Sequence, residues 1–145
     1  MTINYYLILF LVMFITGLLL NPMNVLVYNI DDLKLSLTLI YGALFMASTM
    51  LISHEIIHYI IHKKINTNIF IFGILLSTFI SIFLLRNQFL VNDKEWLKRM
   101  ISHHSTALTT STKIYNRTTD KKIKELAGNI IRTQENEITL MKSLL

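Results

Sequence analysis

Residues 98–105 read Lys98-Arg99-Met100-Ile101-Ser102-His103-His104-Ser105, and they decide how the whole chain is interpreted. Two adjacent histidines follow a methionine by one helical turn, inside the only segment polar enough to be a water-exposed domain. The chain before this segment is largely apolar, and the chain after it has the pattern of a second helix that folds back over the first. The sequence therefore predicts an all-α protein in which a membrane domain precedes a two-helix hairpin.

Composition points to the lipid bilayer. The 145-residue chain has room for one compact unit, and 52% of its residues are hydrophobic, with a mean hydropathy of +0.49, which is too apolar for an ordinary soluble domain. It contains no cysteine, so disulfides, thiolate ligands and cysteine nucleophiles are excluded. The net charge of +5 lies mainly in the last third and at Lys63-Lys64. Charge beside apolar runs usually reflects topology or anionic lipid, and we expect no nucleic-acid partner.

The predicted membrane domain covers residues 1–88 and contains three apolar runs. Each run is near the roughly 20 residues that a helix needs to cross a bilayer; the spans are expected at about 5–20, 35–62 and 69–85. A cleaved signal peptide is the alternative for the first run. A retained helix is favoured because no basic residue precedes the run and no small-x-small cleavage site follows it.

Charge in the loops predicts the orientation. The loop at Lys63-Lys64 is the basic one between spans, so the positive-inside rule places it in the cytoplasm. The loop around Asp31 and Asp32 is then outside, the N-terminus is cytoplasmic, and everything after Arg86 is extracytoplasmic.

The predicted hairpin covers residues 92–145, with helices at about 93–116 and 120–144. Asn92 followed by Glu95 has the form of a capping box at the start of the first helix. A largely apolar stripe recurs at helical spacing in both helices, with one polar residue in each, His104 and Gln134. The stripes are Trp96, Leu97, Met100, Ile101, His104 and Leu108, then Ile123, Leu126, Ala127, Ile130, Ile131, Gln134, Ile138 and Met141. Two helices alone bury little surface, so the hairpin must pack on the spans or on a second copy, and we predict a homodimer that completes a four-helix bundle.

The hairpin carries a candidate metal site. Met100 lies one turn before His103 and His104. Closure with the turn at Asn116 to Asp120 brings the residues near His104 level with those near Ile130 to Glu137 on the facing helix, where Gln134, Glu137 and Met141 share a face. Imidazole with thioether suits copper, particularly Cu(I), whereas imidazole with carboxylate suits zinc or iron. The alternative is that the methionines are ordinary core residues.

Two motifs in the hairpin resemble a known family. They read Met100-Ile101-Ser102-His103-His104-Ser105-x-Ala107-Leu108 and Leu126-Ala127-x-x-Ile130-Ile131-x-x-Gln134-x-x-Glu137-Ile138-x-x-Met141. Over residues 92–145 the chain resembles the domain-of-unknown-function 305 family, and Leu85-Arg86-Asn87-Gln88 loosely resembles a step found in its membrane-anchored members. The resemblance implies a ferritin-like helical fold outside the cytoplasm and a link to copper handling. It implies Met100, His103, His104, Glu137 and Met141 as ligands. Ser102 stands where the family usually has proline.

A second constellation lies in the second span, where Met46, Met50, His54, His58 and His62 recur every four residues. His54-Glu55-Ile56-Ile57-His58 matches H-E-x-x-H, in which two histidines bind zinc and the glutamate acts as base, but neither other span supplies a third ligand. A secondary metal site at His54, His58, His62 and Met50 is expected. A relay for a soft metal and a set of incidental interfacial histidines are the alternatives.

These observations predict a membrane-anchored metal-binding protein, with copper preferred, that buffers or hands on its metal and is more a binder than an enzyme. A structural or accessory subunit of a larger membrane assembly is the alternative. A metal-dependent hydrolase at His54-Glu55-x-x-His58 is the weaker one.

Overall fold

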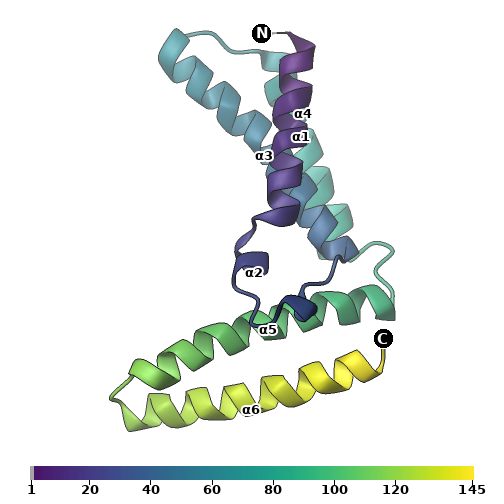
Figure 1. Cartoon of the computed structure of the whole chain (residues 1–145). Helices are drawn as coiled ribbons and strands as arrows, with labels where there is room; N and C mark the ends of the chain where they lie inside the picture. The colour runs from purple at the N-terminus through teal and green to yellow at the C-terminus, as the bar shows by residue number, and fades with distance from the viewer. Residues whose placement is uncertain (1) are drawn as a thin grey trace. The chain divides into compact units, whose positions relative to one another are not determined.

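The computed structural model describes residues 2–145, so Met1, the first residue of the predicted membrane domain, lies outside the described residues. Helices and turns account for the ordered elements, and residues 2–145 contain no strand (Figure 1). The elements are α1 (Ile3–Leu19), α2 (Pro22–Val25), the 3-10 turn η1 (Ile30–Asp32), α3 (Leu37–His62), α4 (Thr67–Phe79), the π-helical segment η2 (Ile80–Arg86), α5 (Asp93–Arg117) and α6 (Lys121–Ser143). The all-α prediction is confirmed.

The chain forms two compact units that interleave in sequence, whereas its length predicted room for one. The first consists of the residues up to Leu20 together with Thr38–Leu90, and the second consists of Asn21–Leu37 together with Val91–Leu145. The segment between the first two apolar helices therefore belongs with the C-terminal hairpin rather than with the helices that it connects.

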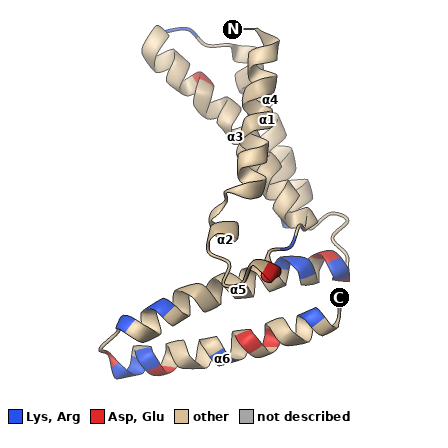
Figure 2. Ribbon diagram, viewed as in Figure 1, with Lys and Arg blue, Asp and Glu red and all other residues tan. Residues whose placement is uncertain are grey.

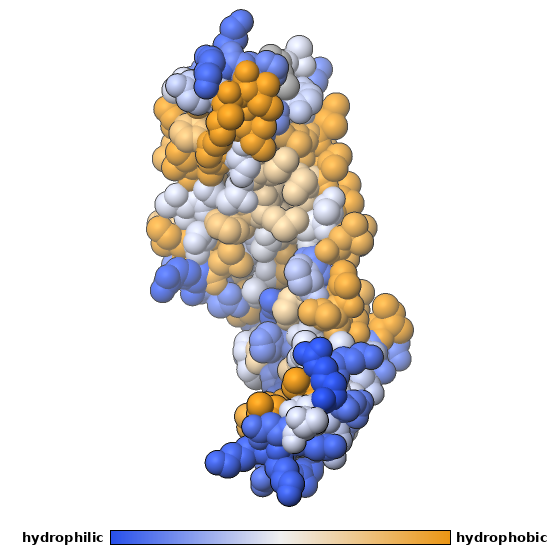
Figure 3. Space-filling view, turned by 90° about the vertical axis from the view of Figure 1, so that its left-hand side faces the viewer, coloured by the Kyte–Doolittle hydropathy of each residue, from blue (hydrophilic) through white to orange (hydrophobic). Residues whose placement is uncertain are grey.

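Three helical stretches in the first part of the chain are long and apolar enough to cross a membrane. They are Ile3–Val25, Leu37–His62 and Thr67–Arg86, judged by length and composition. Figure 2 shows almost no charged residue on α1, α3 and α4, whereas α5 and α6 carry many. Figure 3 shows hydrophobic residues gathered over the first unit and hydrophilic ones over the hairpin. The prediction of three helices of spanning length is confirmed.

Small residues let the apolar helices approach closely. A Cβ atom added to Gly17 of α1 would lie 3.0 Å from the Cα of Ala43 in α3. A Cβ added to Gly73 of α4 would lie 2.9 Å from Cγ1 of Ile52. Ala47 of α3 is completely buried, so close backbone contacts form part of the interior of the first unit, beside buried larger side chains such as Tyr6, Leu51 and Ile80.

The hairpin in the second unit packs α5 against α6 over a small apolar core. Side-chain caps start both helices: Asn92 accepts a hydrogen bond from the Glu95 N–H (3.0 Å), and Asp120 accepts from the Lys122 N–H (2.8 Å). The core contains Leu97, Ile101, Leu108, Ile138 and Met141, with Met100 and Ile131 packed against it. Trp96, Ile123 and Leu126, which the helical periodicity placed on the buried stripes, are about half exposed instead, at 50%, 45% and 59%.

Candidate functional site

The hairpin brings a histidine and a glutamate together across its two helices. Nδ1 of His104 on α5 lies 3.0 Å from Oε2 of Glu137 on α6, with the two side chains 14% and 46% exposed. Both helices run for more than twenty residues on either side of a short turn, and this antiparallel pairing sets the register. The structure thus places His104 opposite Glu137.

The contact between these two groups is close, but it is not a directed hydrogen bond. Nδ1 of His104 is buried, and it has no hydrogen-bond partner that satisfies the angular requirements, although the carboxylate lies within ion-pair distance. The nitrogen therefore remains able to bind another group, and a carboxylate lies beside it. This donor set fits a metal ion.

The two methionines lie in the layer next to this pair. Met100 is one turn before His104, and Met141 is one turn after Glu137, so antiparallel pairing puts the methionines at the same level. Met141 is buried at 7% exposure in the hairpin core, and Met100 packs against the same cluster. Both methionines thus lie one helical turn from the His104–Glu137 pair and contribute to the apolar core.

His103 differs from His104 in its surroundings. It is exposed, and its ring centroid lies 5.8 Å from that of His104 in an edge-on arrangement. Partial burial, followed by the neighbouring charges of His104 and Arg99, lowers the pKa of His103 below its ordinary value of 6.5. This imidazole is accordingly neutral, and able to bind a metal, at lower pH than an isolated histidine.

The five predicted ligands are only partly assembled. Among residues 2–145, no three His, Asp or Glu side chains meet in a metal-binding arrangement. His104 and Glu137 face each other, Met100 and Met141 lie one layer away in the core, and His103 lies on the outer side of α5.

The serines on either side of the histidine pair hold the segment between the first two apolar helices. Ser105 Oγ donates to Oδ2 of Asp32 (2.7 Å), and Ser102 Oγ donates to the backbone carbonyl of Asp32 (2.7 Å). Each hydroxyl also accepts a backbone N–H of the same segment, from Tyr28 (2.9 Å) and Lys34 (3.0 Å) respectively. Sequence reasoning identified neither serine as a contact residue.

Two further charged groups complete this attachment. The carboxylate of Asp32 is fully buried, and Lys142 of α6 forms an ion pair with it. Glu95 accepts the backbone N–H of Leu37 (2.7 Å) and a hydrogen bond from Lys98 (2.6 Å), and these contacts lower its pKa, with the Lys98 bond as the main cause. We call the contacts of Asp32, Ser102, Ser105, Glu95 and Lys142 the loop clamp. The capping box is realised in its Asn92 half, while the Glu95 carboxylate is used in the loop clamp.

The H-E-x-x-H motif in α3 is arranged around a buried glutamate. Glu55 is 0% exposed. It accepts hydrogen bonds from the hydroxyl of Tyr6 in α1 (2.6 Å), from the backbone N–H of Asn66 before α4 (2.6 Å) and from Nδ1 of His54 (3.2 Å). With both carboxylate oxygens occupied in this way, Glu55 joins three helices and presents no face to a substrate, so the geometry does not favour the hydrolase interpretation.

The histidine rings of the predicted secondary site lie along α3 at unequal distances from one another. The rings of His54 and His58 are 6.2 Å apart between centroids, and those of His58 and His62 are 4.8 Å apart. Met50 precedes His54 by one turn and is partly buried.

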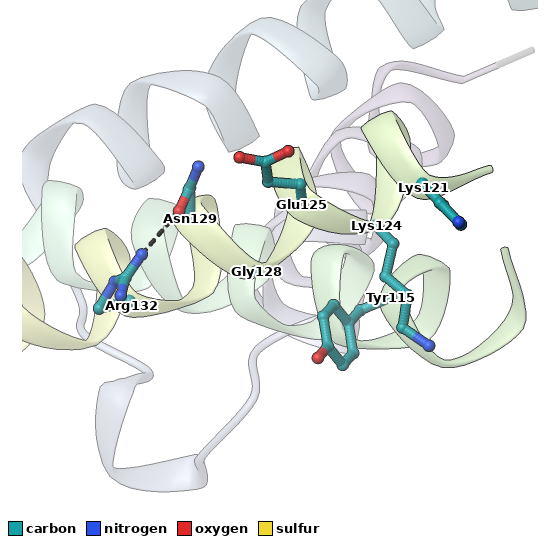
Figure 4. Close-up of a pocket in the computed structure, with 7 residues that line it drawn as sticks. All are labelled: Tyr115, Lys121, Lys124, Glu125, Gly128, Asn129 and Arg132. Carbon is teal, nitrogen blue, oxygen red and sulfur yellow. Dashed lines mark hydrogen bonds between the residues drawn. The ribbon is translucent and has the colours of Figure 1, made fainter. Parts of the chain in front are cut away.

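A basic hollow of about 420 Å³ lies near the turn between α5 and α6 (Figure 4). Asn129 accepts a hydrogen bond from Arg132 (2.6 Å), and the Lys124 ammonium lies 5.1 Å from the centre of the Tyr115 ring. Figure 4 shows Lys121, Lys124 and Arg132 pointing in different directions, so their charges do not converge on one ligand position.

Residues 85–145 match a family model described as domain of unknown function (DUF305). The chain is also 38% identical over 132 residues to the uncharacterized protein L153 of Acanthamoeba polyphaga mimivirus, an alignment that covers 91% of this chain and 85% of the relative. The similarity thus extends from the hairpin into the apolar helices. No solved structure matches the chain.

Proposed function

We propose that this chain, which belongs to the same family as mimivirus protein L153 and carries a DUF305 domain over residues 85–145, is a membrane-anchored metal-binding protein that prefers copper. The His104–Glu137 contact is the observation on which this proposal rests. A buried imidazole nitrogen without a directed hydrogen bond and an adjoining carboxylate supply two ligands on facing helices. A metal held there serves as cargo, to be buffered or passed on, and no catalytic step is required.

Copper is preferred because of the layer next to the pair. The thioethers of Met100 and Met141 are soft ligands that favour Cu(I), while His104 and Glu137 alone would suit zinc or iron. His103 supplies a second imidazole from the same turn of α5. A rotamer change at Met100 or Met141 costs little, since methionine is unbranched and flexible, so metal binding and core packing are compatible roles for these residues.

Membrane anchoring is supported by how the segments are grouped. Three spans place the segment between spans one and two on the same side as the chain after span three, and Asn21–Leu37 forms one compact unit with Val91–Leu145. The Tyr6 hydrogen bond to buried Glu55 also supports a retained first helix, because cleavage would remove the partner of a buried carboxylate. By the positive-inside rule, we propose a cytoplasmic N-terminus and an extracytoplasmic, ferritin-like hairpin.

The absence of cysteine makes this topology directly testable. Lys64 in the α3–α4 turn and Thr119 in the hairpin turn are exposed positions at which a single cysteine can be introduced. A membrane-impermeant maleimide added to intact cells should label the Thr119→Cys protein but not the Lys64→Cys protein. Labelling at Lys64→Cys alone would reverse the orientation, and equal labelling of both in sealed cells would contradict a spanning arrangement.

A homodimer is the proposed assembly. Large apolar side chains of the hairpin remain exposed, among them Trp96 at 50%, Leu126 at 59% and Leu140 at 59%, and a second hairpin would cover them as in a four-helix bundle. Light scattering of the detergent-purified protein should give twice the chain mass after correction for detergent. A monomer at all protein concentrations would refute the dimer without affecting the metal proposal.

The test of the function is the metal content of the detergent-purified full chain, measured by elemental mass spectrometry after loading with Cu(I) under reducing conditions. Copper near one equivalent per chain is expected, with loss in His103→Ala/His104→Ala and reduction in Glu137→Gln. Asn136→Ala, an exposed change next to Glu137, is the matched control and should retain the metal. Metal retained in the double histidine variant would place binding elsewhere. Failure to take up metal would favour the accessory-subunit alternative, which predicts loss of assembly on changing Ile130 and Ile131.

A further inference from the structure

The end of α3 positions one histidine by a backbone reversal. α3 ends at His62, and Lys63 adopts a left-handed conformation (φ 55°) while its N–H still bonds to the Tyr59 carbonyl (2.8 Å). The reversal returns the next carbonyl, that of Lys64, to within 2.7 Å of Nδ1 of His58. A carbonyl can only accept a hydrogen bond, so Nδ1 of His58 carries the proton, and the lone pair of the neutral ring is on Nε2.

This arrangement is the one that metal-binding histidines use. Such histidines commonly donate their second ring N–H to a backbone carbonyl or carboxylate, which fixes the tautomer and the ring orientation. His62 lies one helical turn after His58, and the two ring centroids are 4.8 Å apart. Histidines four residues apart on one helical face are a recurrent pair of metal ligands.

His54 is engaged differently, although the H-E-x-x-H motif would pair it with His58. Its Nδ1 lies 3.2 Å from the Glu55 carboxylate, and its Nε2 lies 3.2 Å from the Tyr5 hydroxyl. The carboxylate accepts a hydrogen bond from Nδ1–H, which leaves Nε2 to accept a hydrogen bond from the Tyr5 hydroxyl. Both nitrogens of His54 are therefore occupied, and its ring is 6.2 Å from that of His58.

We propose that His58 and His62 form a second metal site, separate from the hairpin, that binds a borderline divalent ion such as Zn²⁺ or Cu²⁺ through two imidazoles, with water at the remaining positions. Met50 lies two helical turns before His58, and its thioether is therefore too far along α3 to complete a Cu(I) site with His58 and His62. Glu55 is buried and bonded to Tyr6 and Asn66, so its carboxylate does not complete the site either. The ammonium group of Lys63 lies 5.8 Å from the centre of the Tyr59 ring, where the ring face stabilises its charge.

The test uses the full chain in detergent with His103→Ala/His104→Ala as background, which removes the hairpin histidines. Calorimetric titration with Zn²⁺ should give one binding event in this background. Adding His62→Ala should weaken it by at least about tenfold, the loss that even an outer-shell partner of a ligand produces. With Cu²⁺ as the probe, the electron paramagnetic resonance spectrum should show coupling to two imidazole nitrogens, reduced to one by His62→Ala.

His54→Gln is the matched control, because glutamine can still donate to Glu55 and accept from Tyr5. This variant should bind Zn²⁺ as the background does. Weakening by His54→Gln equal to that by His62→Ala would overturn the assignment in favour of the H-E-x-x-H pair, and unchanged affinity in His62→Ala would remove the site. His62 is exposed at the end of α3, so circular dichroism should show unchanged helicity in His62→Ala. The hairpin site is tested separately, in the chain that keeps His103 and His104.

Discussion

Ser105 donates a 2.7 Å hydrogen bond to the buried carboxylate of Asp32, a residue 73 positions earlier in the chain. Lys142 of α6 neutralises the same carboxylate, so Asp32 contacts both helices of the hairpin. Since Ser102 and Ser105 bracket His103-His104, the candidate metal ligands and the attachment of the loop share the same two turns of α5. The unit therefore has three parts: α5, α6 and the segment 21–37. The loop clamp adds buried contacts that two helices alone would not have.

Replacing Asp32 should loosen this unit. Asp32→Ala removes the acceptor of Ser105 and the partner of Lys142, both in a buried position, and the loss of a buried hydrogen-bonded partner costs about 1–3 kcal/mol. The expected result is a lower thermal midpoint by circular dichroism and faster proteolysis within residues 21–37. Asp31→Ala is the control, because Asp31 is an exposed neighbour in the same turn. Equal effects of the two changes would show that the loop clamp does not stabilise the unit.

The helices, and the level of His104 against the stretch from Ile130 to Glu137, could be predicted because they depend on local periodicity and on a short turn. The pairing of His104 with Glu137 itself, at one end of that stretch, came from the structure. The loop clamp could not, because it joins residues about 70 positions apart and Ser102 looked like a simple replacement of proline. Glu55 was ambiguous for the same reason. The H-E-x-x-H pattern is identical whether its glutamate faces a metal or a neighbouring helix, and the deciding group, Tyr6, lies 49 residues earlier.

Glu55 should act as a structural acceptor. Glu55→Gln keeps the shape and can keep its partners, because the Tyr6 hydroxyl and Nδ1 of His54 can each accept as well as donate, but it loses the carboxylate charge. Hydrogen bonds to a charged group contribute about 1 kcal/mol more than neutral ones, so the change should cost about 1 kcal/mol. The thermal midpoint of the detergent-solubilised protein should fall, while metal bound by the hairpin should be unchanged. Wild-type stability of Glu55→Gln would contradict the structural role and reopen a chemical one.

The contact between α1 and α3 should be sensitive to a single methyl group. In Gly17→Ala the added Cβ would lie 3.0 Å from the Cα of Ala43, a backbone atom that cannot move aside. Overpacking of this kind typically costs about 1–3 kcal/mol. Gly42→Ala in α3 is the matched control, since a Cβ there meets nothing within 4 Å and alanine is the better helix former by about 1 kcal/mol. The two variants should shift the thermal midpoint in opposite directions, and a shift in the same direction would rule out the close α1–α3 contact.

Stability should depend on pH through His103. Burial and the charges of His104 and Arg99 lower its folded pKa, so between this lowered pKa and its ordinary value of 6.5 the folded chain holds fewer protons than the unfolded chain. The free energy of unfolding must then rise with pH across this interval and level off above about 6.5.

Glu95, whose folded pKa is also lowered, contributes stability that is lost as pH falls below its ordinary value of 4.5, so its effect lies in a separate, more acidic range. His103→Gln should reduce the slope just below pH 6.5 and leave the acidic limb intact. Thermal midpoints measured from about pH 4 to about pH 8 test this, and an unchanged slope in His103→Gln would assign the dependence to another group.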